Sequence, residues 1–417
     1  MKPRRILFLV ENLPSPFDRR VWQEAAALRD AGYSVSIICP TGRGCERKFE
    51  VIDGIHIWRY DLPVEGSGAA GYAVEYASAL FQTFFLSWVV FFRRGFDVIH
   101  ACNPPDLFFL IGAFYKLFGK KFLFDHHDAN PELYEAKFGR KDFFWKVMLW
   151  LERMTFRVAD VSIATNESYR RIALQRGRMP PGRVFVVRSG PSLERMKVIP
   201  PVESLKCGKR HLVGYVGVMG RQEGIDYLLR AVAHIVHHVG RRDVHFGLVG
   251  GGTSLEEMRR FAARLGVAGY VTFTGRVSDA EMLAMLNTAD VCVNPDVAND
   301  MNDISTMNKI MEYMALGKPV VQFDLAEGRT SAQAASLYAR HNDAVDLARK
   351  ILELLDAPEL REAMGEFGRK RVLEELEWRH EAPKLLAAYA ALEPGSPFGR
   401  GQVSAWRRVR RAIFPFL

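Results

Sequence analysis

The sequence predicts an α/β protein built from two doubly wound, Rossmann-like domains, each with a parallel β-sheet. Three observations support this fold class. Short apolar runs alternate with helical stretches along the first half of the chain, the alternation stops over residues 191–210, and it then restarts. Such alternation is typical of a parallel sheet with helices on both faces. Prolines, a glycine and mixed charges at 191–210 indicate a linker between the two domains.

The first half carries the pattern of the first domain. Apolar runs predict strands at residues 5–10, 34–40, 55–59, 97–101, 121–128, 161–165 and 184–188. Helical periodicity predicts helices at residues 19–32, 73–94, 107–118, 143–158 and 167–177. We place this domain at residues 1–195.

The second half repeats the pattern after the break. Strands are predicted at residues 211–219, 244–252, 270–275, 290–295 and 319–325, and helices at 225–240, 254–266, 279–289 and 308–316. We place this second domain at residues 196–375. Two doubly wound domains are expected to bind ligand in the cleft between them, at the carboxyl ends of their strands. Gly251 and Gly252 follow a strand without the full GxGxxG pattern, and no P-loop is present, so neither a dinucleotide nor an NTPase site is supported.

Composition and charge narrow the class of partner. The 417 residues are 48% hydrophobic and 25% charged, which is ordinary for a globular protein. A net charge of +9 favours an anionic partner, but the basic clusters lack the aromatic interleaving of a nucleic-acid platform, so no nucleic acid is expected. Five scattered cysteines without a CxxC pair indicate reduced thiols in the cytoplasm. Glu11 ends the first apolar run, which is therefore interpreted as a strand and not as a signal peptide.

Two segments suggest contact with a membrane surface. Residues 76–92 carry no charge and are followed by Arg93 and Arg94, but they are slightly short for a membrane span. We interpret them as a core helix with one apolar face left for lipid or a partner. Residues 396–417 form a basic, aromatic tail that fits a membrane-surface anchor, with a frayed tail as the alternative. We expect a peripheral protein on the inner face of the plasma membrane.

The stretch 308–321, NKIMEYMALGKPVV, predicts a helix that carries one acid, a glycine turn and a buried strand. Lys309 and Glu312 are three residues apart and share one face near the helix start. That end of a helix attracts anions, and a lysine strengthens the attraction. Glu312 could accept hydrogen bonds from the hydroxyls of a ribose. The alternative is an ordinary surface Lys–Glu pair.

Four ordered blocks of the second domain resemble the nucleotide-sugar domain of family 4 glycosyltransferases, which have the GT-B fold. The blocks are YVGVMGRQEGIDYLLRA, HFGLVGGG, VTFTGRVSDAEMLAMLNTADVCVNPD and NKIMEYMALGKPVV. In the first domain, SPFDRRVWQEAAALRDAGYSVSIICP, DVIHACNPPD, FDHHDANPELY and VVRSGP resemble that family's acceptor-side domain. The resemblance covers about residues 4–390. It implies transfer of a sugar from a nucleoside diphosphate to an acceptor with retention, without a bound metal or other cofactor.

The resemblance also implies roles for individual residues. Glu312 matches the acid that holds the donor ribose, and His127 matches the acceptor-side histidine near the reacting sugar. The remaining donor-side candidates are Gly217, Gly220 and Arg221 at the diphosphate turn, Gly275, Arg276 and Val277 beside a uracil or guanine base, and Asn308 at the helix start. Asp128 joins His127 on the acceptor side. A terminal helix at residues 376–395 would cross back to the first domain.

At several positions this chain departs from the family pattern, and these departures change the roles that we expect for the residues around them. Val218 and Glu223 stand where many relatives carry an Arg and a Lys, so Lys309 is the candidate replacement for the phosphate cation. Ile304 replaces a second Glu, and the neighbouring Asp303 is the candidate for the sugar hydroxyls.

Two further interpretations concern the acceptor side. Arg19 and Arg20 replace a Gly-Gly turn and are candidates for meeting acceptor phosphate, with a solvated pair at a helix start as the alternative. The DHHD run at 125–128 offers potential metal ligands, but side chains alternate along a strand, so no metal site is expected.

These patterns lead to one main function and two alternatives. The main expectation is a retaining hexosyltransferase that acts on a lipid-linked or membrane-associated saccharide acceptor in polysaccharide or glycolipid biosynthesis. A sugar-nucleotide epimerase of the same fold would turn over its substrate without an acceptor. A non-catalytic nucleotide-sugar-binding subunit would bind donor without turnover.

Overall fold

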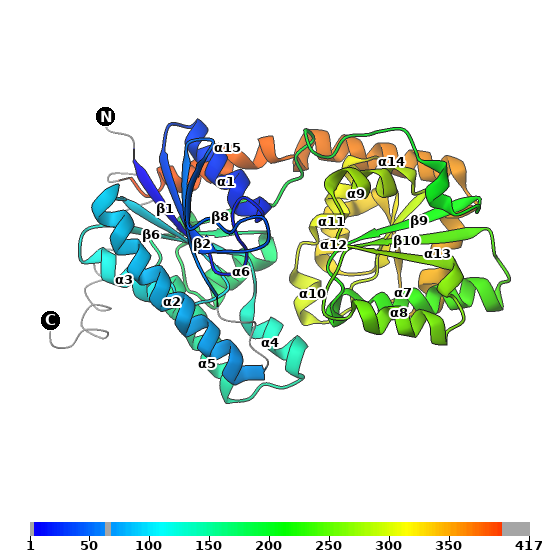
Figure 1. The fold of residues 1–417 in the computed structure, drawn as a ribbon, viewed down its shortest axis with the longest axis horizontal. Coiled ribbons are helices and arrows are strands. Elements are labelled where there is room, and N and C mark those ends of the chain that lie inside the picture. The colour runs from blue at the N-terminus through cyan, green and yellow to red at the C-terminus, as the bar shows by residue number, and fades with distance from the viewer. Residues whose placement is uncertain (1–3, 63–67, 394–417) are drawn as a thin grey trace. The chain divides into compact units, whose positions relative to one another are not determined.

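The computed structural model describes residues 4–62 and 68–393. The chain divides into two compact units, the first formed by the chain up to Ser189 and from Glu381 onward, the second by Gly190–His380 (Figure 1). We had placed the corresponding divisions at residues 195 and 375. Each unit contains one β-sheet covered by helices, and each is described by itself. The basic tail predicted at 396–417 lies outside the described residues.

The first unit is built on a sheet with the strand order β3-β4-β2-β1-β5-β6-β7-β8. Its strands are β1 Arg5–Leu9, β2 Ser34–Pro40, β3 Phe49–Ile52, β4 Ile55–Tyr60, β5 Val98–Cys102, β6 Lys121–His126, β7 Val161–Ala164 and β8 Val184–Val186. All pairings are parallel except that of β3 with β4. The predicted parallel sheet is confirmed.

The antiparallel edge strand β3 was not predicted. It forms a hairpin with β4 through Asp53 and Gly54, which both have positive φ angles, of 49° and 78°. An Asp-Gly pair suits the two-residue hairpin turn that needs such angles.

Helices of the first unit are α1 Arg19–Asp30, α2 Gly68–Arg93, α3 Phe109–Lys116, α4 Asn130–Phe138, α5 Phe143–Val158 and α6 Glu167–Gln175. The terminal helix α15, Trp378–Ala390, enters this unit from Glu381 onward. Side-chain oxygens of Asp18 and Asp142 accept backbone N–H groups at the first turns of α1 and α5, which fixes where these helices begin.

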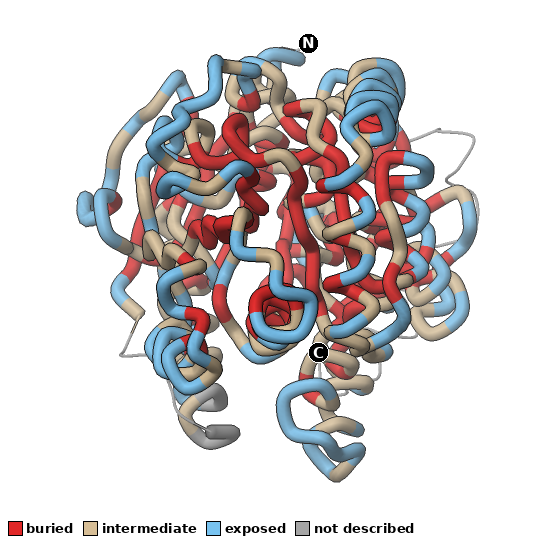
Figure 2. The backbone as a smooth tube through the Cα atoms, turned by 90° about the vertical axis from the view of Figure 1, so that its right-hand side faces the viewer, coloured by how far each residue is buried: buried red, intermediate tan, exposed pale blue. Residues whose placement is uncertain are grey.

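The second unit has the all-parallel strand order β11-β10-β9-β12-β13-β14. Its strands are β9 His211–Val216, β10 Val244–Val249, β11 Val271–Gly275, β12 Val291–Asn294, β13 Val320–Phe323 and β14 Ser336–Ala339. Its helices are α7 Ile225–Ala233, α8 Leu255–Arg264, α9 Asp279–Thr288, α10 Asp300–Ile304, α11 Asn308–Ala315, α12 Ala326–Ala332, α13 Ala344–Leu355 and α14 Pro358–Arg371. Figure 2 shows buried strands behind helices whose outer turns are exposed.

Both sheets reverse their strand order at one point, between β1 and β5 and between β9 and β12. In open α/β sheets, ligands bind outside the carboxyl ends of the strands at such a point. The loops after these strands are therefore where functional residues are expected in each unit.

Candidate active site

Three glycine turns meet at the carboxyl ends of neighbouring strands in the second unit. They follow β9, β10 and β11, and hydrogen bonds between main-chain atoms tie them together. Gly217 N donates to Val249 O at 3.0 Å, and Gly250 N donates to Gly275 O at 3.0 Å. Met219 N in turn donates to Gly251 O at 2.9 Å. The structure thus brings together the predicted diphosphate turn and the predicted base-side loop.

The close packing of these turns requires a glycine at position 250. Gly250 has a φ of +132°, and a Cβ atom there would lie 1.8 Å from the carbonyl oxygen of Gly217. No other residue fits without moving the backbone. Gly251 and Gly252 stand out in the sequence, but Gly250 is the glycine that holds two turns in contact.

Helix α11 places Lys309 beside the first of these turns. The Lys309 Nζ atom donates to Asp296 Oδ1 at 2.8 Å and lies 5.0 Å from the centre of the Tyr215 ring. Burial opposes the charged form of this lysine, but the Asp296 carboxylate raises the pKa of Lys309 above its ordinary value. Lys309 is therefore a cation at the turn, and Asp296, which the sequence pattern does not point to, is its counter-ion.

Glu312 lies on the same helix but has a different partner. Arg195 Nη1 donates to Glu312 Oε1 at 2.9 Å, and Arg195 Nε donates to Asp279 Oδ2 at 2.7 Å. Asp279 begins α9, directly after the base-side loop. Arg195 thus links Glu312 to that loop. The surface Lys–Glu pair considered as an alternative is wrong, because each residue is paired elsewhere.

The other donor-side candidates lie along the same edge of the sheet and differ in their exposure and hydrogen-bond partners. Arg221 is exposed and lines a cavity of about 430 Å³ together with Arg230 and Phe261, on the α7–α8 side of the turn. Glu223 Oε2 accepts a hydrogen bond from Gly220 N at 3.0 Å, so the acid that replaces a usual lysine shapes the turn itself.

The remaining candidates on this side come from the β11–α9 loop and from α10 and α11. Arg276 and Asn308 are exposed, and Val277 packs at the edge of a hydrophobic core. Asp303 Oδ1 accepts a hydrogen bond from Ala326 N at 2.8 Å and so caps helix α12. That contact gives Asp303 a structural role, and its predicted contact with sugar hydroxyls stays a prediction.

In the first unit, His127 follows β6 and is held from two sides. Its Nε2 atom lies 2.5 Å from Asp125 Oδ2 and 3.0 Å from Arg20 Nε. Its backbone N–H donates to Asn103 Oδ1 at 2.7 Å, and Asn103 Nδ2 donates to the carbonyl oxygen of Asp128 at 2.7 Å. The loop that carries both acceptor-side candidates is therefore clamped to the end of β5.

Arg20 is a buried structural cation. Its guanidinium donates to Asp125 Oδ1 at 2.7 Å and to Val187 O at 2.9 Å, and it pairs with Glu24 Oε1 at 3.0 Å. The prediction that Arg20 meets acceptor phosphate is wrong, because protein atoms occupy its donors. The alternative of a solvated pair is wrong for Arg20 as well, whereas Arg19 is exposed.

Charges in this buried network balance. Burial opposes ionisation of Asp125, but Arg20 and His127 hold the pKa of its carboxyl well below the usual range. Burial raises the pKa of Glu24 well above its ordinary value, and burial lowers the pKa of His100. The network thus places the Arg20 guanidinium and the Asp125 carboxylate beside two buried groups, Glu24 and His100, whose charged forms burial disfavours.

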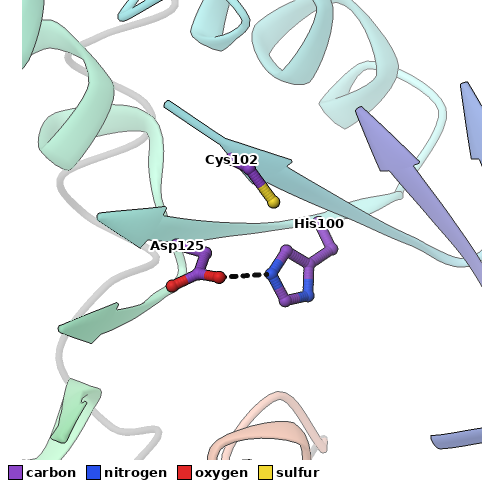
Figure 3. Close-up of side chains that lie close together, drawn as sticks. All are labelled: His100, Cys102 and Asp125. Carbon is purple, nitrogen blue, oxygen red and sulfur yellow. Dashed lines mark ion pairs between the residues drawn. The ribbon is translucent and has the colours of Figure 1, made fainter. Parts of the chain in front are cut away.

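His100, Cys102 and Asp125 form a group whose potential metal-binding atoms lie within 4.8 Å of one another (Figure 3). The Asp125 carboxylate already has a protein partner, because Arg20 pairs with it at 2.7 Å. The other ring nitrogen of His100, Nδ1, contacts the Tyr389 hydroxyl at 2.8 Å. A metal cation would have to displace the guanidinium, so the donor set does not fit a metal site.

Family models match both halves of the chain. A family model described as "Glycosyl transferase 4-like domain" matches residues 18–190, and one described as "Glycosyl transferases group 1" matches residues 210–357. The 2-deoxystreptamine glucosyltransferase of Streptomyces kanamyceticus is 27% identical over 180 residues, which cover 43% of this chain and 45% of that protein. The GDP-mannose-dependent alpha-(1-6)-phosphatidylinositol monomannoside mannosyltransferase of Mycolicibacterium smegmatis is 30% identical over 192 residues, which cover 44% and 48%. The chain thus spans about half the length of these two curated relatives.

Solved structures share the fold at low identity. Sucrose-phosphate synthase from Thermosynechococcus elongatus superposes with a TM-score of 0.75 and 19% identity, over 93% of this chain and 99% of that chain. The glycosyltransferase WaaG, involved in lipopolysaccharide biosynthesis, gives 0.68 and 15%, over 94% and 100%. The Anabaena protein HepE, solved with UDP and glucose, gives 0.70 and 14%, over 93% and 99%. This likeness establishes the GT-B fold.

Proposed function

We propose that this chain, which belongs to the family 4 group of glycosyltransferases, transfers a hexosyl group from a nucleoside diphosphate sugar to a lipid-linked or membrane-associated saccharide acceptor with retention. The convergence of the diphosphate turn, the base-side loop and helix α11 on one sheet edge carries the proposal. The named activities of relatives and the UDP complex of HepE are consistent with it.

Donor binding follows from the chemistry of that edge. The departing diphosphate carries negative charge, which cations and main-chain N–H groups stabilise. Lys309 supplies a buried cation, and the side chain of the N-cap residue Met307 makes no capping hydrogen bond at the start of α11. Glu312 supplies an acceptor for ribose hydroxyls once Arg195 shares or releases it. No metal or cofactor is included in this proposal.

An apolar surface on the first unit supports a membrane-bound acceptor. Helix α2 has an inverted polarity: Phe81, Phe85 and Phe92 are 73%, 64% and 76% exposed, whereas Thr83 and Ser87 are fully buried. From Val74 to Arg93 it is long and apolar enough to cross a membrane by length and composition, and 22% of that stretch is buried. We propose that it lies on the bilayer, because its hydroxyl-bearing face packs inward.

Helix α5 extends this surface. Phe143, Lys146, Trp150, Arg153 and Arg157 are exposed at spacings of three and four residues, so they share one face. Aromatic contacts from α2 to α3 and from α3 to α5 join the two helices into one side of the unit. Exposed aromatic rings with Lys and Arg favour an interface with anionic lipid.

The proposal is tested by measuring nucleoside diphosphate release with uridine and guanosine diphosphate sugars and lipid-linked acceptors. We expect release with one donor class that depends on acceptor, and a product with the donor's anomeric configuration. Glu312→Ala should abolish most donor binding. Absence of product with every pair, together with unchanged donor affinity in Glu312→Ala, would overturn the proposal.

One observation favours a second candidate, a non-catalytic nucleotide-sugar-binding subunit. Asp296 neutralises Lys309, and Glu223 is an additional acid at the same turn, so this turn offers less positive charge than that of relatives with an Arg and a Lys. Such a subunit would bind donor in a calorimeter yet release no nucleoside diphosphate with any acceptor.

A further inference from the structure

The buried network of the first unit continues from His127 to the terminal helix. Tyr389 on α15 is fully buried, and its hydroxyl lies 2.8 Å from His100 Nδ1. The opposite ring nitrogen, His100 Nε2, lies 3.3 Å from Asp125 Oδ2 (Figure 3). That same oxygen lies 2.5 Å from His127 Nε2. Four side chains thus lie in succession from α15 to the acceptor-side histidine, and the contact between His100 and Asp125 is a close approach without hydrogen-bond geometry.

Donor and acceptor chemistry fixes where the protons lie. An ionised carboxylate only accepts, and Asp125 is ionised because Arg20 faces it. Two bare lone pairs would repel at 2.5 Å, so we place a proton on His127 Nε2 that is donated to Asp125. The Arg20 Nε–H, which lies 3.0 Å from His127 Nε2, then donates to Asp125 Oδ2 at 3.2 Å and not to the imidazole. His100 Nε2 faces Asp125 Oδ2 at 3.3 Å and Glu24 Oε2 at 3.4 Å, so we place its proton there, which leaves His100 Nδ1 to accept from the Tyr389 hydroxyl at 2.8 Å.

We propose that Asp125 holds His127 with its proton on Nε2, so that Nδ1 is the ring atom presented to a ligand, and that His100 and Tyr389 position Asp125. That Nδ1 contacts a hydroxyl of the sugar or the acceptor rests on the proposed function. The position of the proton on Nε2 does not depend on the proposed function. Tyr389, interpreted from the sequence as a packing residue, becomes part of the positioning network.

The sharpest test is Asp125→Asn. Arg20 would keep the amide oxygen, and the amide NH₂ group would then face His127 Nε2 as a donor. Because two donors cannot face each other, the imidazole proton then moves to Nδ1. The same change of tautomer occurs when a carboxylate that holds a catalytic histidine is replaced by an amide. We expect ¹⁵N NMR at a pH where His127 is neutral to report an Nε2–H tautomer in the wild type and an Nδ1–H tautomer in Asp125→Asn.

Assignment and folding are controlled separately. The chain has 11 histidines, so His127→Gln identifies the signal by its loss. Asp160→Asn is the matched control, because Asp160 is likewise paired with a cation, Lys116 of α3 at 3.0 Å, and accepts the Phe122 N–H at 2.9 Å. It should leave the His127 tautomer unchanged. An Nδ1–H tautomer in the wild type, or an unchanged tautomer in a folded Asp125→Asn, would overturn the proposal.

Activity gives the second measurement. Misplacing the proton of a histidine that assists the reaction should lower kcat by about 10²- to 10⁴-fold in Asp125→Asn, with donor KM nearly unchanged. If the wild type shows the expected tautomer but releases no nucleoside diphosphate, the proposed function fails and the proton assignment stands.

Tyr389→Phe tests the far end of the path, since it removes only the hydroxyl. We expect the ¹⁵N shift of His100 Nδ1 to change while its proton stays on Nε2, because Asp125 still faces that atom, and kcat to fall about two- to tenfold. Tyr33→Phe is the matched control, because the Tyr33 ring lies 5.6 Å from the Tyr389 ring but does not contact His100 in the described structure. Equal effects of the two substitutions would overturn the role of Tyr389.

Discussion

At the residue scale, Lys309 carries its charge into a buried site together with its own counter-ion. Asp296 is 1% exposed, and its Oδ2 atom has no hydrogen-bond partner among the described residues. A buried charge without a partner is costly, so Lys309 stabilises Asp296 while no ligand is bound. An arriving diphosphate would compete with Asp296 for the same ammonium group.

Lys309→Ala should therefore weaken binding of the nucleoside diphosphate. A hydrogen bond to a charged group contributes about 1.5–3 kcal/mol, so we expect about a 10- to 100-fold rise in Kd, measured by calorimetry. Asp296→Asn is the paired variant. Because it removes a negative charge next to the phosphate, it should bind at least as tightly as the wild type. Equal losses in both variants would show that the pair is only structural.

Glu11 gives a second prediction at this scale. It follows β1, is 3% exposed, and burial followed by the nearby Glu75 raises its pKa from an ordinary 4.5 to about 8. The folded state then holds a proton that the unfolded chain releases. This group opposes folding progressively as the pH rises from about 4.5 to about 8, by up to about 1.4 kcal/mol per pH unit.

Glu11→Gln removes that titration, so its melting temperature should fall less than that of the wild type between pH 5 and pH 8. Glu46→Gln serves as the control, because Glu46 is an exposed acid of the same unit whose pKa lies below its ordinary value. Identical pH profiles for wild type and Glu11→Gln would contradict the prediction.

Single residues also show what could not be predicted from the sequence. Glu312 and His127 could be picked out because the family motif places them. Their distant partners could not, since Arg195 is 117 residues from Glu312 and Arg20 is 107 residues from His127. Arg20 lies at a polar helix start, which locally resembles a solvated position. Only the packing of α1 against the ends of β6 and β8 turns it into a buried cation.

At the element scale, prediction succeeded where one face is strongly apolar and a cap is present. Helix α5 spans Phe143–Val158, as predicted, with Asp142 as its cap. Helix α4, Asn130–Phe138, was missed because its apolar residues do not follow a single face. Strand β3 was missed because two of its residues are exposed and it lies at the sheet edge.

The three glycine turns yield a prediction about elements. Gly250→Ala would place a methyl group against the carbonyl of Gly217, and the turns after β9 and β10 would have to separate. Overpacking and backbone strain of this kind cost about 1–3 kcal/mol. We expect a lower melting temperature together with weaker donor binding.

Gly269→Ala is the matched control for that variant, because a Cβ atom at Gly269 meets no heavy atom within 4 Å. It should leave both measurements unchanged. Wild-type donor affinity in Gly250→Ala would mean that contact between the turns does not shape the donor site.

At the scale of the whole molecule, the sequence indicated the two sheets and the break between them. Every donor-side candidate belongs to the second unit, and every acceptor-side candidate belongs to the first. The local pattern of apolar and polar residues predicts this division, because each unit has its own hydrophobic core. The cleft between the units stays a prediction, since a local pattern contains no information on the relative placement of two cores.

The apolar side of the first unit gives the last prediction. If α2 and α5 rest on a bilayer, Phe81→Ser with Phe85→Ser should weaken binding to anionic vesicles by more than tenfold, because a fully buried Phe contributes about 1.5–3 kcal/mol. Co-sedimentation with phosphatidylglycerol-containing vesicles measures this, and phosphatidylcholine vesicles should bind the wild type less at low salt, since Lys146, Arg153 and Arg157 favour anionic headgroups.

Phe367→Ser, on α14 of the second unit, is the matched control, because Phe367 is also exposed but lies in a unit without the proposed surface. The double variant should melt no lower than the wild type, since neither ring packs in the core. Phenylalanine rings that are more than 60% exposed on a packed helix need some apolar cover. If the double variant loses an oligomer and keeps its vesicle binding, that cover is a second copy of the chain and not a bilayer.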